Sequence, residues 1–374
     1  MRILFACGGT AGHINPAIAV ASLIRKERHG AKILFAGNPD GMEATLVPKA
    51  GFDFGPIEIQ GFQRKITPEN IKRNLGAARL LLTASAKSKK IIQDFRPDVA
   101  MGTGGYVSGP VILKAARMGI RTVTHEQNAF PGVTTKLLAR NVDKVLLAVP
   151  EAEDFLPRGK KYIVTGNPIR QEILYAEREK SRLSLGVGNK VCLLTFGGSL
   201  GARRVNEAVA DLMAHYIGKP DVHFIHATGR YGTELFPKLL QERGVSYENN
   251  PHIDIREYIH DMPDCLAAAD LVLCRAGAIS LSELEAAGRA SILIPSPNVA
   301  ENHQYHNAMV LANKNAAIMI EEKNLTGERL CKVVGQLVND PQELENLGKN
   351  ARSMSITDAA QRICREIYSL LGES

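Results

Sequence analysis

The 374-residue chain contains no tryptophan, and aromatic residues make up only 5% of it. So low an aromatic content argues against a carbohydrate platform built of aromatic rings and against a surface on which nucleic-acid bases stack. Nowhere does the chain approach the roughly 18 consecutive apolar residues that a membrane-spanning helix requires. What remains is a globular chain whose length is comfortable for two domains.

The cysteines include no C-x-x-C pair and do not fit a zinc site. They are Cys7, Cys192, Cys265, Cys274, Cys331 and Cys364. Scattered through apolar surroundings, they are typical of buried free thiols in a reducing compartment. The first residues have a superficial likeness to a signal peptide, but residues 8–10 and 13–16 interrupt the apolar stretch. We therefore expect a strand, a glycine loop and a helix there, in a protein that stays in the cytoplasm.

The net charge of +7 is concentrated in one segment. From Arg64 to Arg96, nine Lys and Arg residues stand against Glu69 and Asp94, which accounts for the whole excess. The helical part of this segment supplies a membrane-facing set, predicted as Ile71, Lys72, Arg73, Leu75, Arg79 and Leu82. Apolar and cationic residues side by side suit an anionic lipid surface. A solvated basic face of an ordinary helix and a nucleic-acid patch stay open as alternatives, although no nucleic-acid motif accompanies the segment.

Short β-type runs alternate with helix-length segments along the chain. The runs lie at 3–7, 32–37, 99–102, 122–125 and 145–148, and they resume from Val191 with runs at 191–196, 271–274 and 291–295. This alternation predicts an α/β fold with parallel sheets wrapped by helices. In such folds ligands bind at the loops that follow the strand ends.

Two glycine loops recur in the same order in each half of the chain. The first pair reads G-G-T-A-G at 8–12 and G-G-S-L-G at 197–201, and Asn15 and Asn206 follow in the predicted helices. The second pair is 103–105, after one predicted strand, and 276–277, after another. The repetition predicts two similar α/β domains that face one another.

The turn at Gly166-Asn167-Pro168 is where we place the domain boundary. The prediction is an N-terminal domain of residues 1–166 plus 357–374 and a C-terminal domain of residues 167–356. Apolar residues at helical spacing predict a closing helix over 357–371.

A glycine loop between a strand and a helix suits a diphosphate. Its backbone N–H groups can donate to the phosphate oxygens, and the positive end of the helix dipole attracts the negative charge. Arg203 and Arg204 follow the second loop, and Arg170 could add charge. Glycines that merely permit tight packing are the plainer alternative. A P-loop is absent, and the strand at 32–37 lacks the terminal acid of a dinucleotide site, so NAD is disfavoured.

Three further side chains stand where strands are predicted to end. Glu283 could accept hydrogen bonds from both hydroxyls of a ribose, or could simply be a first-turn acid that complements the helix dipole. His13 could act as a general base or bind a backbone group. Glu126 could line a site or satisfy nearby N–H groups. No D-x-D pair follows a strand end, so no metal clamp is predicted.

Seven motifs stand in order along nearly the whole chain. They read GGTAGHINPAIAVA at 8–21, MGTGGYVSGPV at 101–111, HEQNAFPG at 125–132, GNPIR at 166–170, GGSLGARRVN at 197–206, CRAGAISLSELEAAG at 274–288 and ENHQYHNA at 301–308. A chain that carries all seven resembles the MurG family, the N-acetylglucosaminyltransferases of peptidoglycan synthesis. The resemblance implies a GT-B fold, in which two Rossmann-like domains hold the active site in the cleft between them.

The implied reaction moves GlcNAc from UDP-GlcNAc to the C4 hydroxyl of MurNAc in undecaprenyl-pyrophosphoryl-MurNAc-pentapeptide, which converts lipid I to lipid II. It would invert the anomeric carbon in one displacement, without metal or other cofactor. The implied partners are UDP-GlcNAc, the undecaprenyl-linked acceptor and an anionic membrane surface, with no nucleic acid and with room for other cell-wall synthesis proteins. The resemblance also implies that the protein is bound peripherally at the cytoplasmic face of the bacterial cell membrane.

The resemblance also assigns site residues. The donor side would comprise Thr10, Ala11, Gly12, Asn128, Arg170, Ser199, Ile259, Ala278, Ile279, Ser280, Leu281, Ser282, Glu283 and Gln304. Glu283 would bind the ribose, Ile259 the uracil through its backbone, and Gln304 the transferred sugar, while Ser199 and Arg170 would face the diphosphate. The catalytic candidates are His13 as the base, with a binding role as its alternative, and Tyr106 and Glu126 on the acceptor side.

Small departures accompany the resemblance. Ala11 stands where the family usually has a third glycine, Leu200 where Gln is common, and Tyr305 where a second Gln is frequent. The competing enzymes are a UDP-GlcNAc 2-epimerase or a glycolipid glycosyltransferase of the same architecture. The alternative outside the enzymes is a catalytically inactive scaffold that binds a nucleotide sugar at the membrane. The presence of His13, Arg170, Glu283 and Gln304 together argues against it.

Overall fold

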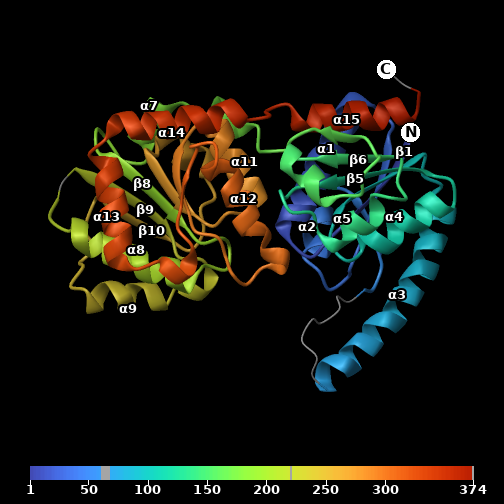
Figure 1. Cartoon of the computed structure of the whole chain (residues 1–374), viewed down its shortest axis with the longest axis horizontal. Helices are drawn as coiled ribbons and strands as arrows, with labels where there is room; N and C mark the ends of the chain where they lie inside the picture. The colour runs from blue at the N-terminus through green and yellow to red at the C-terminus, as the bar shows by residue number, and fades with distance from the viewer. Residues whose placement is uncertain (60–67, 220, 373–374) are drawn as a thin grey trace. The chain divides into compact units, whose positions relative to one another are not determined.

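The computed structural model describes the chain except residues 60–67, 220 and 373–374, and the side chains at 68–79, 81 and 82 are likewise outside the described part. The chain forms two compact units (Figure 1). Unit 1 comprises Met1–Ile169 and Asp358–Ser374, and unit 2 comprises Arg170–Thr357.

Unit 1 is built on a seven-stranded sheet in the order β3-β2-β1-β4-β5-β6-β7, with every described pairing parallel. Its strands are β1 (Arg2–Cys7), β2 (Lys32–Gly37), β3 (Asp53–Pro56), β4 (Val99–Gly104), β5 (Arg121–Glu126), β6 (Lys144–Leu147) and β7 (Tyr162–Val164). Its helices are α1 (Ala11–Glu27), α2 (Glu43–Lys49), α3 (Pro68–Phe95), α4 (Ser108–Arg117), α5 (Val133–Leu138), the 3-10 helix η1 (Pro150–Phe155) and α15 (Ala359–Leu370).

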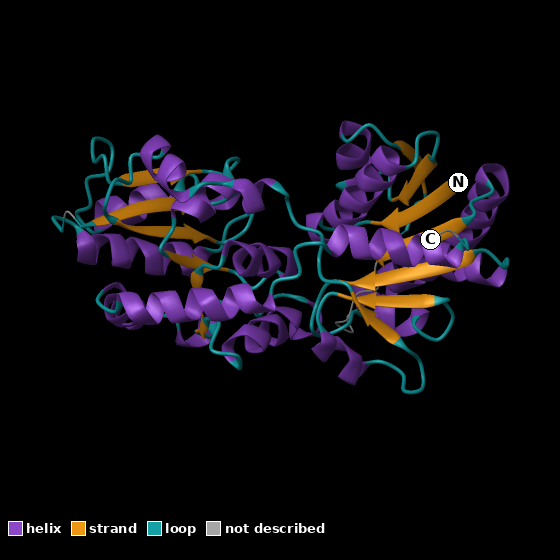
Figure 2. Cartoon of the chain, turned by 90° about the horizontal axis from the view of Figure 1, so that it is seen from above, coloured by secondary structure: helices purple, strands orange, loops and turns teal. Residues whose placement is uncertain are grey.

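Helices cover both faces of the unit 1 sheet (Figure 2). Along β1, Ile3 and Phe5 pack with α1 and α15 on one face, whereas Leu4 packs with α3, α4 and α5 on the other. Because side chains alternate along a strand, an uninterrupted apolar strand fills both cores at once. The predicted closing helix is confirmed as α15, whose Tyr368 hydroxyl donates to Glu27 of α1 over 2.8 Å.

Unit 2 has a six-stranded sheet in the order β10-β9-β8-β11-β12-β13, and its described pairings are again parallel. The strands are β8 (Val191–Phe196), β9 (Val222–Ala227), β10 (Ile253–Arg256), β11 (Leu271–Cys274), β12 (Ala290–Leu293) and β13 (Ile318–Met319). The helices are α6 (Glu172–Tyr175), α7 (Arg178–Ser184), α8 (Arg203–Tyr216), η2 (Arg230–Gly232), α9 (Leu235–Glu242), α10 (Met262–Ala268), α11 (Ala278–Ala287), η3 (Ala300–Asn302), α12 (His303–Ala312), η4 (Glu322–Asn324), α13 (Gly327–Val338) and α14 (Pro341–Met354). The prediction of two α/β domains with parallel sheets is confirmed.

In each sheet the strand order reverses at one point, between β1 and β4 in unit 1 and between β8 and β11 in unit 2. Such a switch point separates the loops beyond two neighbouring strands and is where parallel α/β sheets bind ligands. Both pairs of repeated glycine loops lie at the carboxyl ends of the strands that flank the switch points. The repeat in the sequence therefore marks the binding edge of each sheet.

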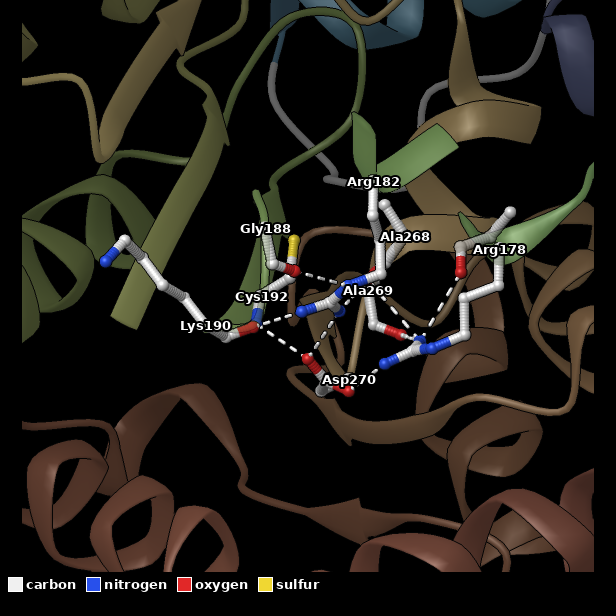
Figure 3. A network of polar contacts seen from close by, with 9 residues as sticks. Arg178, Arg182, Gly188, Lys190, Cys192, Ala268, Ala269 and Asp270 are labelled. Carbon is white, nitrogen blue, oxygen red and sulfur yellow. Dashed lines mark hydrogen bonds and ion pairs between the residues drawn. The ribbon is translucent and has the colours of Figure 1, made fainter. Parts of the chain in front are cut away.

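The amino edge of the unit 2 sheet is tied to α7 through Asp270, which directly precedes β11 (Figure 3). Figure 3 shows the Asp270 carboxylate facing the guanidinium groups of Arg178 and Arg182, and both pair with it. The same arginines donate to the carbonyls of Ala269 and Ala268 at the end of α10, over 3.0 and 2.9 Å. Because a helix cannot satisfy its own last carbonyls, these contacts hold α10 and α7 against the sheet.

The structure tests the predictions about the cysteines and about membrane-spanning helices. All six cysteines are free, and five are buried as predicted, whereas Cys331 is half-buried. In the described residues no helix is both long and apolar enough to cross a membrane. The membrane-facing set of Ile71, Lys72, Arg73, Leu75, Arg79 and Leu82 lies on α3, but those side chains are outside the described part of the chain.

Candidate active site

The first glycine loop leads from β1 into α1, so that His13 lies in the first turn of α1. The His13 carbonyl accepts a hydrogen bond of 2.7 Å from the Thr103 hydroxyl of β4. A Cβ on Gly104 would lie 2.7 Å from Cδ2 of the His13 ring, so the ring packs directly against that glycine. Both contacts come from β4, so the second strand at the switch point fixes the backbone and the ring of His13.

The hydrogen bonds of His13 decide which ring nitrogen carries the proton. Nδ1 lies 3.1 Å from the carbonyl oxygen of Gly8 and 3.4 Å from the Thr10 hydroxyl. A carbonyl can only accept, so Nδ1 is the donor and the neutral ring keeps its lone pair on Nε2. An imidazole held in this tautomer has the form of a general base at Nε2.

The second loop of unit 1 meets the first at close quarters. Gly105 has a φ of +81°, and a Cβ there would lie 2.3 Å from the Gly8 oxygen. Tyr106 follows with 61% of its surface exposed. The structure therefore brings the acceptor-side candidate Tyr106 next to the loop that orients His13.

Glu126, at the end of β5, is 4% exposed and organises the loop that follows it. Its Oε1 accepts from the backbone and the side-chain amide of Asn128 over 3.1 and 3.0 Å. Its Oε2 accepts from the Gly132 N–H over 3.0 Å and from the Thr135 hydroxyl over 2.5 Å. Four donors on one carboxylate favour the alternative that Glu126 satisfies nearby N–H groups, and they make it the anchor of Asn128.

His125 lies before it in the same strand and is fully buried. Its Nε2 is 2.9 Å from the Gly166 carbonyl, and its Nδ1 is 3.0 Å from Nε2 of Gln127. Burial lowers the pKa of His125, against the opposing effects of the Gly166 hydrogen bond and the Glu126 charge. The neutral imidazole, hydrogen-bonded at both ring nitrogens, connects β5 to the residues that follow β7.

A cavity of about 460 Å³ opens at the carboxyl ends of β8 and β11 in unit 2. The second glycine loop forms one wall through Gly198 and Gly201, and Arg203, Arg204 and Arg275 are among the other lining residues. Arg203 and Arg204 open α8, so the positive end of the helix dipole adds to their charge. The arrangement suits a diphosphate. A larger groove of about 850 Å³, between α8 and α13, contains no predicted site residue.

The opposite wall of this cavity depends on Arg275, just after β11. Its guanidinium pairs with Glu322 and donates to the carbonyls of residues 294–295, over 3.1 and 3.3 Å. Gln304 accepts from the Ser296 N–H over 2.9 Å, so the turn after β12 is held from both sides. Our sequence analysis missed Arg275, Glu322 and Ser296. The end of a strand was the signal available for Arg275, whereas nothing local marks Glu322.

Arg170 and Glu283 form a two-pronged ion pair in unit 2. Nε and Nη2 of Arg170 donate to the two Glu283 oxygens over 2.7 and 2.8 Å, and the Glu283 side chain is 8% exposed. Although burial lowers the pKa of Arg170, the hydrogen bond and charge of Glu283 raise it on balance. The alternative that Glu283 is a first-turn acid is wrong, because α11 begins at Ala278 and its first turn holds no acidic residue.

The remaining predicted donor residues are spread over several elements. Residues 278–282 form the start of α11, where Ser280 lines the cavity. Ile259 follows β10 and is 2% exposed, and Ser199 is exposed in the second glycine loop. Thr10, Ala11, Gly12 and Asn128 belong to unit 1. Among the described residues, no group of three or more His, Cys, Asp or Glu side chains is arranged to hold a metal ion.

Comparisons with known proteins agree with this geometry. Residues 3–147 match the glycosyltransferase family 28 N-terminal domain, and residues 192–363 match the glycosyltransferase family 28 C-terminal domain. The crystal structure of MurG from Acinetobacter baumannii has a TM-score of 0.78 at 28% identity and covers 98% of this chain and 99% of its own. A relative from Acetivibrio thermocellus is 44% identical over 372 residues, which are 99% of this chain and 98% of its own length. The chain belongs to the MurG family.

That relative carries the name UDP-N-acetylglucosamine--N-acetylmuramyl-(pentapeptide) pyrophosphoryl-undecaprenol N-acetylglucosamine transferase. The resemblance to the MurG family and the GT-B fold class predicted from the motifs are confirmed. A putative UDP-N-acetylglucosamine 2-epimerase from Listeria monocytogenes has a TM-score of 0.70 at 13% identity and covers 100% of this chain and 97% of its own. At that identity, the likeness between this chain and the putative epimerase shows a shared fold and no more.

Proposed function

We propose that the chain is an inverting N-acetylglucosaminyltransferase of peptidoglycan synthesis. It moves GlcNAc from UDP-GlcNAc to the C4 hydroxyl of MurNAc in undecaprenyl-pyrophosphoryl-MurNAc-pentapeptide, and so makes lipid II from lipid I. The name of the Acetivibrio relative, which matches nearly the whole chain, supports this choice of substrates. Unit 1 serves the acceptor and unit 2 binds the donor.

The observation that carries the proposal is the difference between the two switch points. At one, His13 presents the lone pair of Nε2, with its Nδ1 on the Gly8 carbonyl. At the other, Arg203 and Arg204 line a cavity beside a glycine loop. A base for a hydroxyl and a cationic pocket for a diphosphate are the two needs of a sugar transfer from a nucleoside diphosphate.

In the transfer, the acceptor C4 oxygen bonds to the anomeric carbon as the bond from that carbon to the UDP oxygen breaks. Nε2 of His13 takes the hydroxyl proton, and its Nδ1–H stays on the Gly8 carbonyl. UDP leaves with the electron pair, and its charge is stabilised by the α8 dipole and the arginines of the cavity. Gln304 holds the transferred sugar, and Glu283 the ribose.

The proposed location is the cytoplasmic face of the bacterial cell membrane. The cationic segment from Arg64 to Arg96 supports it, as do Val133 and Leu137 of α5, which are 64% and 53% exposed. Replacing Lys72, Arg73 and Arg79 together by Ser should weaken binding to anionic liposomes and leave UDP affinity unchanged, since each cation contributes up to about 1 kcal/mol near such a surface. Undiminished binding to anionic liposomes would contradict the proposal that this segment binds the membrane surface.

The test of the reaction is transfer of labelled GlcNAc from UDP-GlcNAc to a short-chain lipid I analogue in the presence of EDTA. Lipid II product in EDTA is the expected result, and it would establish both the acceptor and the independence from metal. Tight UDP-GlcNAc binding without transfer, together with formation of UDP-ManNAc, would replace the proposal by a 2-epimerase.

A further inference from the structure

A carboxylate is buried beneath the first glycine loop. Glu43 is 1% exposed, and its two oxygens accept from the Gly9 N–H over 3.1 Å and from the Asn38 N–H over 2.9 Å. Glu43 opens α2, where an acidic residue ordinarily interacts with the free N–H groups of its own helix. Here both partners lie outside α2, so the carboxylate serves the loops at the ends of β1 and β2.

Three glycines make the space that Glu43 occupies. A Cβ on Gly8 would lie 2.2 Å from its Oε1, one on Gly41 would lie 2.4 Å from its Oε2, and one on Gly37 would lie 2.5 Å from its Cγ. Burial, with a further contribution from the Glu43 charge, raises the pKa of the neighbouring Cys7 thiol. The protein thus encloses a carboxylate where its first glycine loop could have held an external anion.

One peptide group connects Glu43 to His13. The peptide between Gly8 and Gly9 donates its N–H to Glu43 and accepts the Nδ1–H of His13 on its carbonyl oxygen, over 3.1 Å in each case. A carboxylate that accepts from a peptide N–H polarises the carbonyl of the same peptide, because hydrogen bonds in a chain strengthen one another. The carbonyl becomes a better acceptor for the imidazole N–H.

We propose that Glu43 is a positioning residue for His13, acting through the Gly8–Gly9 peptide. It holds the imidazole with its proton on Nδ1 and its lone pair on Nε2, and it stabilises the cation that forms when Nε2 accepts a proton. The inference rests on the proposed function, in which His13 is the base. Glu43 itself exchanges no proton and forms no bond with a substrate.

The sharpest test is Glu43→Gln, which keeps the size of the side chain. Both partners of Glu43 are N–H donors, so an amide can satisfy one of them and must turn its own NH₂ toward the other. We expect kcat for GlcNAc transfer to fall about 10- to 100-fold, a smaller loss than the roughly 10²- to 10⁴-fold that the base itself contributes. UDP affinity should stay within about twofold of the unaltered chain, well below the 1.4 kcal/mol of a tenfold step, because Glu43 does not line the cavity of unit 2.

The second readout is the ¹⁵N NMR spectrum of the His13 ring, assigned by comparison with His13→Gln. The unaltered chain should show the Nδ1–H tautomer, and Glu43→Gln should show a mixture of tautomers. This readout needs no acceptor, so it decides the role of Glu43 even if the chain fails to transfer GlcNAc and the proposed function falls. An unchanged His13 spectrum in folded Glu43→Gln would overturn the inference.

A matched control is Glu366→Gln, which removes the negative charge that pairs with Lys144 in the same unit. Lys144 begins β6, at the edge of the sheet opposite the glycine loops. We expect this variant to lose stability but to keep kcat and the His13 spectrum. An equal fall of kcat in both variants would reduce Glu43 to a structural residue. Should Glu43→Gln not fold, Gly41→Ala presses a methyl group on Oε2 instead and should alter the His13 spectrum in the same direction.

Discussion

The two glycine loops share a sequence pattern but are supported by different groups outside the loop. In unit 1 the loop is held through an N–H group, that of Gly9, which donates to the buried Glu43. In unit 2 the loop is held through its carbonyls, since those of Ser199 and Leu200 accept from the N–H groups of Arg230 and Tyr231, each over 3.1 Å. Because N–H groups are what bind a phosphate, the Gly9 N–H is already committed to an internal carboxylate, whereas in the second loop the Gly201 N–H donates to the Gly198 carbonyl of the same loop over 2.9 Å.

The asparagines that follow the loops repeat this difference. Asn206 of α8 is 1% exposed and donates to the Thr228 carbonyl over 3.0 Å, so it joins the second loop to the turn after β9. Asn15 of α1 is exposed. The repeat in the sequence thus predicts equivalent places in the two sheets but not equivalent tasks. The first loop orients a side chain, and the second opens on a cationic cavity.

The largest effect should come from the side chain that the first loop orients. We expect His13→Ala to lower kcat about 10²- to 10⁴-fold, the usual contribution of a general base, and to leave UDP binding unchanged. Transfer of labelled GlcNAc and calorimetric titration with UDP measure the two quantities. A loss of UDP affinity that matches the loss of kcat would instead make His13 a binding residue.

A methyl group on the second loop should do the reverse. Gly201 has a φ of +85°, and a Cβ there would lie 2.3 Å from the Thr228 carbonyl, which is backbone and cannot swing away. We expect Gly201→Ala to move the loop off its support and to weaken UDP binding about 10- to 100-fold, which corresponds to about 1.4–2.7 kcal/mol. The ¹⁵N spectrum of His13 should not change. If UDP binds Gly201→Ala as it binds the unaltered chain, the second loop is not the diphosphate site.

A smaller effect is expected at the ion pair of Arg170 and Glu283, neither of which lines the cavity. Arg170 bonds both oxygens of Glu283, so a ribose that is to use this carboxylate must compete with the guanidinium. Arg170→Gln should weaken UDP binding about tenfold through the lost charge on the diphosphate, about 1.4 kcal/mol. Uridine has no phosphate, and its affinity should hold or improve. Equal losses for UDP and uridine would show that Arg170 supports Glu283 and does not serve the diphosphate.

Much of the fold could be predicted because its signals are local. Apolar runs and the glycines after them indicate where strands end, and the structure has strands at the predicted 32–37, 191–196 and 271–274. The strand expected at 291–295 ends earlier, at Leu293, because Pro295 has no N–H to pair and its carbonyl accepts from Arg275. Here the sequence pattern and the tertiary contacts disagree about the residue at which the strand ends.

The partners within the candidate site could not be predicted from local pattern. Glu43 and Gly9 are separated by 34 positions, Arg275 and Glu322 by 47, and Arg170 and Glu283 by 113. Which carboxylate meets which donor is decided by how the helices pack on the sheet. Glu43 reads in the sequence as an ordinary acid at the start of a helix, and only its burial reveals its function in the loop.

The smallest effect should come from a methyl group on the first loop, at Gly9. Its φ of +87° matches that of Gly201, but no described atom lies within 4 Å of the place of a Cβ. Gly9→Ala therefore costs only the backbone strain of a left-handed residue, about 1–2 kcal/mol. For a unit of this size we expect the melting temperature to fall by about 2–4 °C per kcal/mol, with UDP affinity unchanged. Because the two substitutions share their backbone strain, the difference between them isolates the contact with Thr228. A loss of UDP affinity in Gly9→Ala as large as in Gly201→Ala would mean that both loops bind the donor, and the division of tasks would fall.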